Sequence, residues 1–288
     1  MTTGNILVLD VGGSFLKYGV ADEKGALFPG SVGEAPARAD ESPEKVYEAF
    51  EEVIRRARET APLAGACACF PGPFDYTHGV FRMKHKFQAL FGCSILPPFE
   101  RAGLPVRFLH DSTAYILGEV SDGTLRDAKD PCCVMLGTGL GYTMMKDGKV
   151  LIDESQTPAL SLWCAPFRDG IAEDYVSTRA IQAAYGQPLS VKDIAGLARQ
   201  GDEKALQSFR KTGEALSELM GIIDRRFHPD KLALGGQIAR SADLLHLNLP
   251  FPWEVSHHLD DAALRGAAYY ALHSREECTA VLPKIQLG

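Results

Sequence analysis

The segment ILVLDVGGSFLKYGV at residues 6–20 carries the strongest structural signal in the chain. The apolar run over residues 6–10 predicts a short buried strand that ends at Asp10. A glycine pair then indicates a tight turn, and the apolar pattern resumes over residues 15–20 as a second strand. Because glycine lets a backbone approach a ligand closely, such a turn can direct N–H groups at phosphate oxygens.

Two further glycine turns also follow apolar runs. One is Gly137 to Gly141, which reads GTGLG, and the other is the pair Gly235–Gly236. Any one of them could be only a tight turn, but three turns at strand ends favour a nucleotide cradle. The hydroxyls of Ser14 and Thr138 add neutral donors to two of these turns. The cradle is of neither standard kind, because the P-loop pattern is absent and the GTGLG segment lacks the Rossmann spacing.

Strands and helices alternate along the rest of the chain, which implies an α/β protein with mixed sheets and two similar halves. After the final helix we expect a loose tail. The expected strands cover residues 64–70, 106–109, 132–136 and 231–234, with a hairpin over 142–151, and the expected helices cover 42–60, 112–120, 171–185, 191–200, 202–227 and 260–272.

Composition narrows the class of protein. A chain of 288 residues is long enough for two domains, and its net charge of −7 gives no general attraction to nucleic acid or anionic lipid. The sequence contains no run of 18 uncharged apolar residues, so we expect no membrane span. It also has no recognisable targeting segment, and we therefore expect a cytoplasmic protein. The seven cysteines form no C-x-x-C pair, and those in apolar runs are expected to act as small hydrophobes.

Two aspartates lie at strand ends, where metal binding or proton transfer is expected. Asp10 ends a strand beside the first glycine turn, where a carboxylate can hold Mg²⁺ through water. Asp111 ends another strand and opens a helix, and its carboxylate could accept a proton from a hydroxyl that attacks phosphorus. An aspartate at that position also serves commonly as a helix N-cap, so the local sequence leaves both roles open.

Taken together, these segments resemble the ROK family of bacterial sugar kinases, which have the actin-like ATPase fold. The similarity extends over roughly residues 5–270 and is specific only because its motifs occur jointly and in order. They are the first phosphate motif DVGGSFLKYG at residues 10–19, PGPFD at 71–75, HDSTA at 110–114 with LGE at 117–119, GTGLG at 137–141, GG at 235–236 and the helix DAALRGAA at 261–268.

The resemblance implies a two-domain actin-like (ribonuclease H-like) α/β fold with mixed sheets flanked by helices. Residues 1–115 with 261–275 would form the smaller domain and residues 116–260 the larger one. It also implies ATP and Mg²⁺ as cofactors, a sugar as partner, and an association into homodimers. The implied roles are a catalytic base for Asp111, an Mg²⁺-orienting carboxylate for Asp10, phosphate contacts for Gly12, Gly13, Ser14, Lys17, Gly137, Thr138, Gly139 and Gly141, adenosine contacts for Gly235 and Gly236, and sugar contacts for Pro71, Gly72, His110, Asp111 and Glu173.

The chain departs from the family on the sugar side. The family's E-x-G-H motif has no convincing counterpart in residues 154–161, and its C-x-C-G-x-x-G-C zinc cluster is replaced by a segment with only Cys164. His110 stands where the family usually has asparagine. We therefore expect no structural zinc, and the resemblance leaves the identity of the sugar open.

Two functions follow from the resemblance. The first is an ATP-dependent kinase that transfers the γ-phosphoryl group to a sugar hydroxyl, the 6-hydroxyl of a hexose or hexose derivative. The alternative is a non-catalytic regulatory protein that binds sugar or nucleotide. Some family members are repressors with an N-terminal helix-turn-helix domain, but here the first strand is expected from about residue 5, so we expect no nucleic-acid binding.

Overall fold

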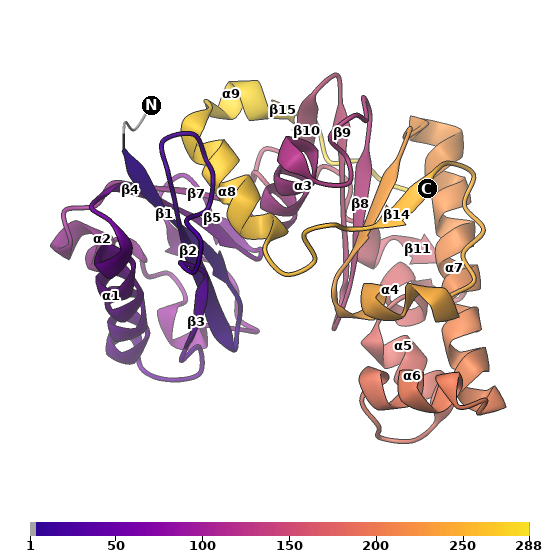
Figure 1. Cartoon of the computed structure of the whole chain (residues 1–288). Coiled ribbons are helices and arrows are strands. Elements are labelled where there is room, and N and C mark those ends of the chain that lie inside the picture. Colours follow the sequence, from indigo (N-terminus) through magenta and orange to yellow (C-terminus); the bar gives the residue numbers. More distant parts are fainter. Residues whose placement is uncertain (1–3, 288) are drawn as a thin grey trace.

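The structure, a computed structural model, describes residues 4–287 and has two lobes on either side of a central pair of helices (Figure 1). The first lobe is built on a five-stranded mixed sheet. Its strands have the order β3-β2-β1-β4-β7 and comprise β1 (Asn5–Val11), β2 (Phe15–Ala21), β3 (Gly33–Pro36), β4 (Leu63–Phe70) and β7 (Val106–His110).

The carboxyl ends of three parallel strands meet at one edge of this sheet. β1 runs parallel to β4 with Asp10 opposite Cys69, and β4 runs parallel to β7 with Phe70 opposite His110. β2 returns antiparallel beside β1 and places Lys17 opposite Asp10. The segments that follow β1, β4 and β7 therefore lie together at the edge where ligands bind in open α/β sheets.

Helices and aromatic rings cover the outer face of the first sheet. α1 (Pro43–Thr60) buries its apolar side there, and α2 (Leu96–Arg101) packs against α1. The short strands β5 (Phe74–Asp75) and β6 (Val80–Phe81) and the 3-10 helix η1 (Gln88–Leu90) complete the lobe. Its core is rich in phenylalanine rings that contact one another: Phe50, Phe70, Phe74, Phe81, Phe99 and Phe108.

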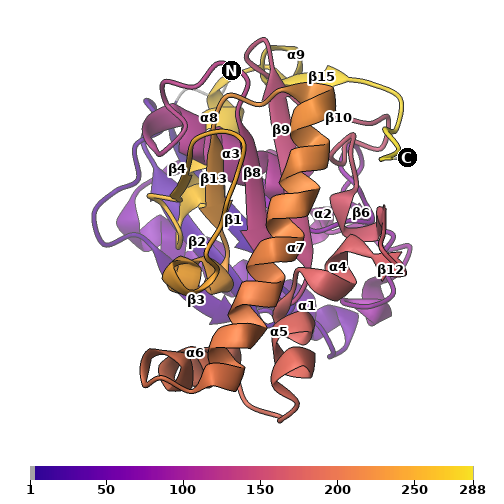
Figure 2. The same cartoon turned by 90° about the vertical axis from the view of Figure 1, so that its right-hand side faces the viewer.

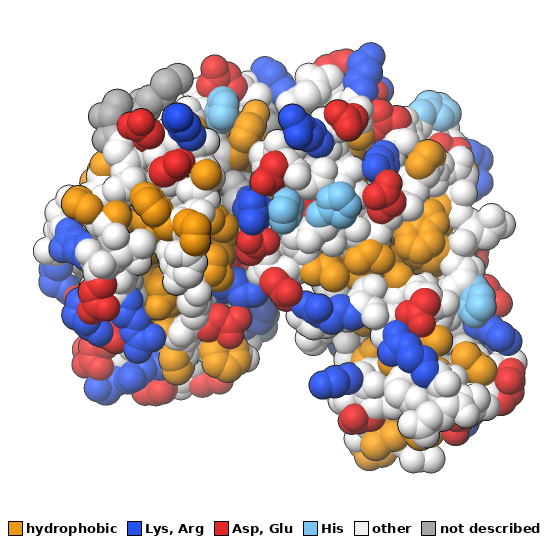
Figure 3. All heavy atoms as spheres, in the orientation of Figure 1, with side chains coloured by type: hydrophobic (Ala, Val, Ile, Leu, Met, Phe, Trp, Pro, Cys, Tyr) orange, Lys and Arg blue, Asp and Glu red, His pale blue; other side chains and the backbone are white. Residues whose placement is uncertain are grey.

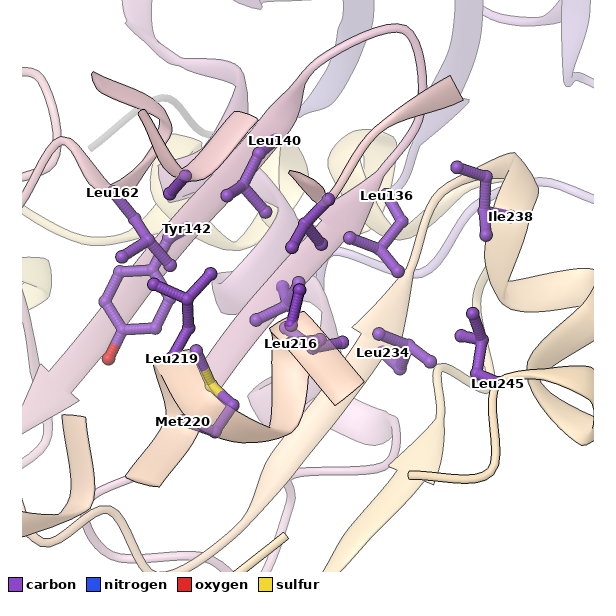
Figure 4. Packing of buried hydrophobic residues seen from close by; sticks show 14 of the residues in the cluster. Leu136, Leu140, Tyr142, Leu162, Leu216, Leu219, Met220, Leu234, Ile238 and Leu245 are labelled. Carbon is purple, nitrogen blue, oxygen red and sulfur yellow. The ribbon is translucent and has the colours of Figure 1, made fainter. Parts of the chain in front are cut away.

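The second lobe contains a six-stranded sheet. α7 (Glu203–Phe227) lies across one face of it (Figure 2). Figure 4 shows the resulting core, in which Leu216, Leu219 and Met220 of α7 pack with Leu136, Tyr142 and Leu234 of the sheet. The strand order is β14-β13-β8-β9-β10-β15, with β8 (Cys132–Leu136), β9 (Leu140–Lys146), β10 (Lys149–Ile152), β13 (Leu232–Gly235), β14 (Trp253–Val255) and β15 (Thr279–Val281).

Two expectations for this lobe have different outcomes. The hairpin over 142–151 is confirmed, because Asp147 and Gly148 both have positive φ in the turn between β9 and β10. The single helix over 171–185 is wrong, because Ser177 accepts a hydrogen bond from Ala180 N and starts a new helix. The remaining elements are α4 (Ala172–Tyr175), α5 (Thr178–Tyr185), α6 (Val191–Arg199), η2 (Leu162–Cys164), η3 (Gln237–Leu244), β11 (Pro166–Phe167) and β12 (Gly170–Ile171).

Helices α3 (Asp111–Asp122) and α8 (Ala262–Leu272) form the central pair between the sheets (Figure 1). They cross closely, since a Cβ at Gly118 would collide with the carbonyl oxygen of Ala262, and one at Gly266 with that of Ala114. α8 also packs on β1 and β4. The proposed division into residues 1–115 with 261–275 and residues 116–260 stays a prediction.

The cysteines behave largely as expected from their apolar surroundings. Five are buried and none of the seven forms a disulfide, whereas Cys93 and Cys164 are exposed. The buried ones suit places where helices lie close to a sheet, because their side chains are small. They are Cys67, Cys69, Cys132, Cys133 and Cys278.

The expectation of a loose tail after the last helix is wrong. Residues beyond α8 form the helix α9 (Arg275–Cys278) and then β15, which pairs parallel with β10. A capping box starts α9, in which Ser274 Oγ accepts from Glu277 N and Glu277 Oε2 accepts from Ser274 N. In the part of the chain from residue 4 to 287, no helix is long and apolar enough to cross a membrane.

Candidate active site

The two lobes face each other across a hollow (Figure 3). A cavity of about 290 Å³ brings together residues from the strand ends of both sheets and from α8. Its lining joins the two aspartates to the glycine turn after β8 and to Gly236, whereas Gly12 and Gly13 of the first turn are not part of it. The lining residues are Asp10, Asp111, Ser112, Tyr115, Met135, Gly137, Gly139, Gly141, Gly236 and Ala263.

The first glycine turn connects β1 to β2. Gly12 N donates to Phe15 O at 3.0 Å and closes the turn, while the Ser14 side chain is exposed. Lys17 Nζ donates to the backbone oxygen of Asp260 at 2.6 Å and lies 3.6 Å from Glu34 Oε1. The hydrogen bond to Asp260 ties β2 to the segment that leads into α8.

Asp10 is a half-buried carboxylate at the end of β1. Burial, with the nearby charge of Asp111, raises its pKa to about 6, although Lys17 and Lys86 act in the opposite direction. The thiol of Cys69 lies 3.7 Å from Asp10 Oδ1. Asp10 is therefore close to half ionised near pH 6, and a nearby cation would favour its charged form.

The raised pKa of Asp10 predicts a pH-dependent stability of the metal-free protein. Because the folded chain keeps the Asp10 proton up to about pH 6, whereas an unfolded aspartate loses it near pH 4, ionisation favours the unfolded state. From pH 4 to 7 the free energy of unfolding should fall by about 2 kcal/mol relative to Asp10→Asn. Urea unfolding of both proteins in EDTA measures the difference. Parallel pH profiles for the two proteins would contradict it.

Asp111 begins α3 next to the cavity, and its side chain is 39% exposed. One carboxylate oxygen is firmly held: Oδ1 accepts from Ser112 N at 2.6 Å and from Ser112 Oγ at 3.1 Å, and it lies 3.0 Å from His110 Nδ1. Burial opposes its ionisation, but the neighbouring His110 and the hydrogen bonds from Ser112 hold the pKa of Asp111 below its usual range. The other oxygen, Oδ2, has no hydrogen-bond partner among residues 4–287.

The role of helix N-cap at α3 belongs to His110, so the N-cap interpretation of Asp111 is wrong. His110 has extended backbone angles, and its Nδ1 lies 3.1 Å from Ser112 N, which donates to it. Asp111 is instead the first residue of the helix. The His110 ring also reaches the loop after β4, since a Cβ at Gly72 would lie 3.6 Å from Nε2.

The second glycine turn joins β8 to β9. A Cβ at Gly137 would meet nothing within 4 Å, so the turn borders open space, and Thr138 is exposed. Glu173 lies against the other side of the turn, where its Oε2 accepts from Leu140 N at 2.9 Å and its Oε1 pairs with Arg179 at 2.7 Å. Its contacts thus support the phosphate-side turn, and a sugar contact for Glu173 stays a prediction.

The third glycine pair follows β13. Gly236 has a φ of +81°, and a Cβ there would collide with the backbone of Leu136, so the two strand ends approach closely. Gly235 packs against the ring of Tyr115, whose hydroxyl donates to Ser256 Oγ at 2.8 Å. Tyr115 follows Asp111 by one helical turn, which is the sequence signal that could have placed it at the cavity.

The loop after β4 meets a turn of the second lobe. Asp153 Oδ1 accepts from Ser155 N and Thr157 N, and Gln156 Nε2 donates to Thr77 Oγ1 across the two lobes at 2.8 Å. A second cavity of about 330 Å³ lies here, lined in part by residues 73–77 and 154–157. The Tyr76 ring lines this cavity. Its centroid lies 5.9 Å from that of the His110 ring, so Tyr76 connects this cavity to the residues next to Asp111.

The structure brings only some of the predicted site residues together. Asp10, Asp111, Gly137, Gly139, Gly141 and Gly236 line the cavity of about 290 Å³. Gly72 and His110 lie close to each other in the neighbouring loop region. The lining does not include Gly12, Gly13, Ser14, Lys17, Thr138, Glu173 and Gly235. Sequence reasoning missed Tyr115, Met135 and Ala263. Only Tyr115 had a usable signal, its spacing from Asp111, whereas Met135 and Ala263 are residue types that indicate no particular chemistry.

The two aspartates suit a divalent cation. Burial and the charge of Asp111 raise the pKa of Asp10, and a cation would offset both effects. Mg²⁺ is typically bound by one or two carboxylates together with water and substrate phosphates. Within residues 4–287 no group of three or more His, Cys, Asp or Glu side chains could hold a metal by protein ligands alone. Asp10 would hold Mg²⁺, and the open glycine turns would leave room for phosphates.

The architecture matches solved structures closely. A glucokinase from Streptomyces griseus, in complex with glucose and AMPPNP, has a TM-score of 0.74 at 21% identity, and the match covers 92% of this chain and 98% of that one. A ROK hexokinase from Thermus thermophilus has a TM-score of 0.68 at 25% identity, covering 92% and 96%. The expected fold class, a two-lobed α/β protein of the actin-like ATPase type, is confirmed.

The chain belongs to the ROK family, whose model matches residues 6–274. Its curated relatives include a glucokinase of Thermotoga maritima, 23% identical over 277 residues, which cover 83% of this chain and 84% of that protein. An N-acetyl-D-glucosamine kinase of Vibrio vulnificus is 24% identical, covering 84% and 86%. The DNA-binding transcriptional repressor Mlc of Escherichia coli is 23% identical over 215 residues; that match covers 67% of this chain but 53% of the repressor.

Proposed function

We propose that this protein is an ATP-dependent sugar kinase that phosphorylates a hydroxyl, the 6-hydroxyl of a hexose or hexose derivative. One observation carries the proposal: Asp111 and glycine turns of the second sheet line the same cavity. A phosphate-binding cradle alone would suit any nucleotide-binding protein. A carboxylate with an open oxygen beside it supplies the group that phosphoryl transfer to an alcohol requires.

Asp111 would act as general base. Hydrogen bonds from Ser112 fix Oδ1, so the carboxylate is oriented while Oδ2 stays available to the substrate. As the acceptor oxygen bonds to the γ-phosphorus and the bond to the β-phosphate oxygen breaks, the hydroxyl proton passes to Oδ2 and ADP leaves. The lowered pKa of Asp111 keeps it ionised at neutral pH, as this role demands.

The remaining residues would bind and orient. N–H groups of the turns after β1 and β8 would face the phosphates, and Gly235 and Gly236 would lie beside the adenosine. When bound at Asp10, Mg²⁺ supplies charge neutralisation for the triphosphate. We place the acceptor between the Pro71–Gly72 loop and His110, whose Nε2 makes no hydrogen bond among residues 4–287.

The acceptor cannot be copied from the relatives, because the Asp153–Thr157 turn occupies the region where the family's E-x-G-H motif is expected. A thermal-shift panel of hexoses, N-acetylated hexosamines and other polyols, with and without MgATP, should identify it. A true substrate should raise the Tm, release ADP in a coupled assay and gain 80 Da in mass spectrometry. If no acceptor on a broad panel releases ADP, the kinase proposal fails.

The repressor relative favours a second candidate, a non-catalytic sugar-binding regulator. The same panel separates the two functions. A sugar that raises the Tm without ADP release, with MgATP present, would support the regulator. The oriented carboxylate of Asp111 argues for the kinase, since a protein without turnover needs no base.

A further inference from the structure

Lys86 is a cation that neither the motifs nor the proposed mechanism use. It lies in the loop after β6, between Met83 and Phe87, whose side chains are fully buried. Phe87 also has a positive φ of 51°, so the backbone beside Lys86 is fixed in an uncommon conformation. Lys86 is half-buried, whereas its neighbours Lys84 and His85 are exposed.

The Lys86 side chain lies directly on the first glycine turn. A Cβ built on Gly13 would be 3.0 Å from Lys86 Cδ and 3.3 Å from its Cε, so any larger residue at position 13 would displace the lysine. The charge of Lys86 also acts on the Asp10 carboxylate. The loop after β6 therefore brings a positive charge to the first glycine turn.

The Lys86 ammonium forms no ion pair with any other residue in the range 4–287. Within residues 4–287 no carboxylate lies within 4.0 Å of its ammonium, whereas Lys17, which borders the same turn, contacts both Asp260 O and Glu34. A half-buried ammonium without an anion loses hydration and gains no ion pair. The Lys86 ammonium is therefore available to bind an anionic ligand at the first glycine turn.

We propose that the Lys86 ammonium contacts the γ-phosphoryl group of the nucleotide and stabilises its charge during transfer. This inference rests on the proposed kinase function. Charge develops on the phosphoryl oxygens in the transition state, and a cation placed there in advance contributes much of the rate in phosphoryl-transfer enzymes.

The test compares ADP with AMPPNP, which differ in the γ-phosphoryl group. Titration calorimetry with Mg²⁺ should show that Lys86→Met weakens AMPPNP binding about 10- to 100-fold and leaves ADP binding unchanged. Lys86→Arg should restore part of the loss. Lys84→Met removes an exposed lysine from the same loop and is the matched control, with both affinities unchanged.

Each outcome has a distinct meaning. If wild-type protein binds neither nucleotide, the proposed function fails and this inference falls with it. If wild type binds both, and Lys86→Met keeps the same ratio of affinities, only the Lys86 assignment is overturned. If Lys86→Met raises the KM for the acceptor but leaves the ratio of AMPPNP affinity to ADP affinity unchanged, Lys86 binds the acceptor and the assignment is again wrong.

Discussion

Replacing Asp111 by asparagine is expected to lower acceptor-dependent ADP release by about 10²- to 10⁴-fold, the usual contribution of a general base. Asparagine keeps the shape of the side chain, and its oxygen can still accept from Ser112 N, so the start of α3 should survive. It cannot take the proton of the attacking hydroxyl. The loss should therefore appear in kcat, with little change in nucleotide affinity.

A coupled assay with the acceptor identified by the panel measures this loss, and the Tm increase caused by MgADP verifies that the variant is folded. Asp202→Asn is a suitable control, because Asp202 also stands at a helix start, where it accepts from Ala205 N at 2.8 Å. It caps α7 outside the site, so turnover should remain near the wild-type value. Normal turnover in Asp111→Asn would remove Asp111 from the mechanism.

The second large effect concerns the crossing of α3 and α8. Gly266→Ala should lower the free energy of unfolding by about 3 kcal/mol, the upper part of the range for overpacked sites. The added methyl group would collide with the backbone oxygen of Ala114, and backbone cannot move aside as a flexible side chain can. Both helices are enclosed by sheets, so neither can shift without disturbing a core.

Urea unfolding measures the effect of Gly266→Ala. The control is Gly196→Ala in α6, where a Cβ would meet nothing within 4 Å. Because alanine is the better helix former, that variant should gain up to about 1 kcal/mol. A Gly266→Ala protein as stable as wild type would mean that the helices do not touch as described.

Local sequence patterns predict a large part of the fold. Asp10 and the glycines after it were identifiable because a buried strand that ends in a turn has a characteristic local composition. Other elements have no such signature. β15 exists only because β10 offers an edge to it, and the split between α4 and α5 depends on the cap formed by Ser177.

The candidate site shows the same division. The aspartates and glycines could be predicted as site residues because their chemical properties follow directly from the residue type. The position of Lys86 on Gly13 and the reach of His110 toward Gly72 join segments that are far apart in the chain. The spacing of residues within a motif does not predict such contacts between distant segments.

The sequence alone predicted an α/β protein, which is confirmed, and it singled out three glycine turns and two aspartates, whose roles toward phosphate, Mg²⁺ and proton transfer stay predictions. Those features are local, because each depends on a few adjacent residues and their backbone freedom. Only the tertiary structure decided that His110 rather than Asp111 caps α3, that Glu173 supports a glycine turn, and that Lys86 lies on the first turn. The reason is physical: these positions follow from how two sheets and a pair of crossing helices pack together.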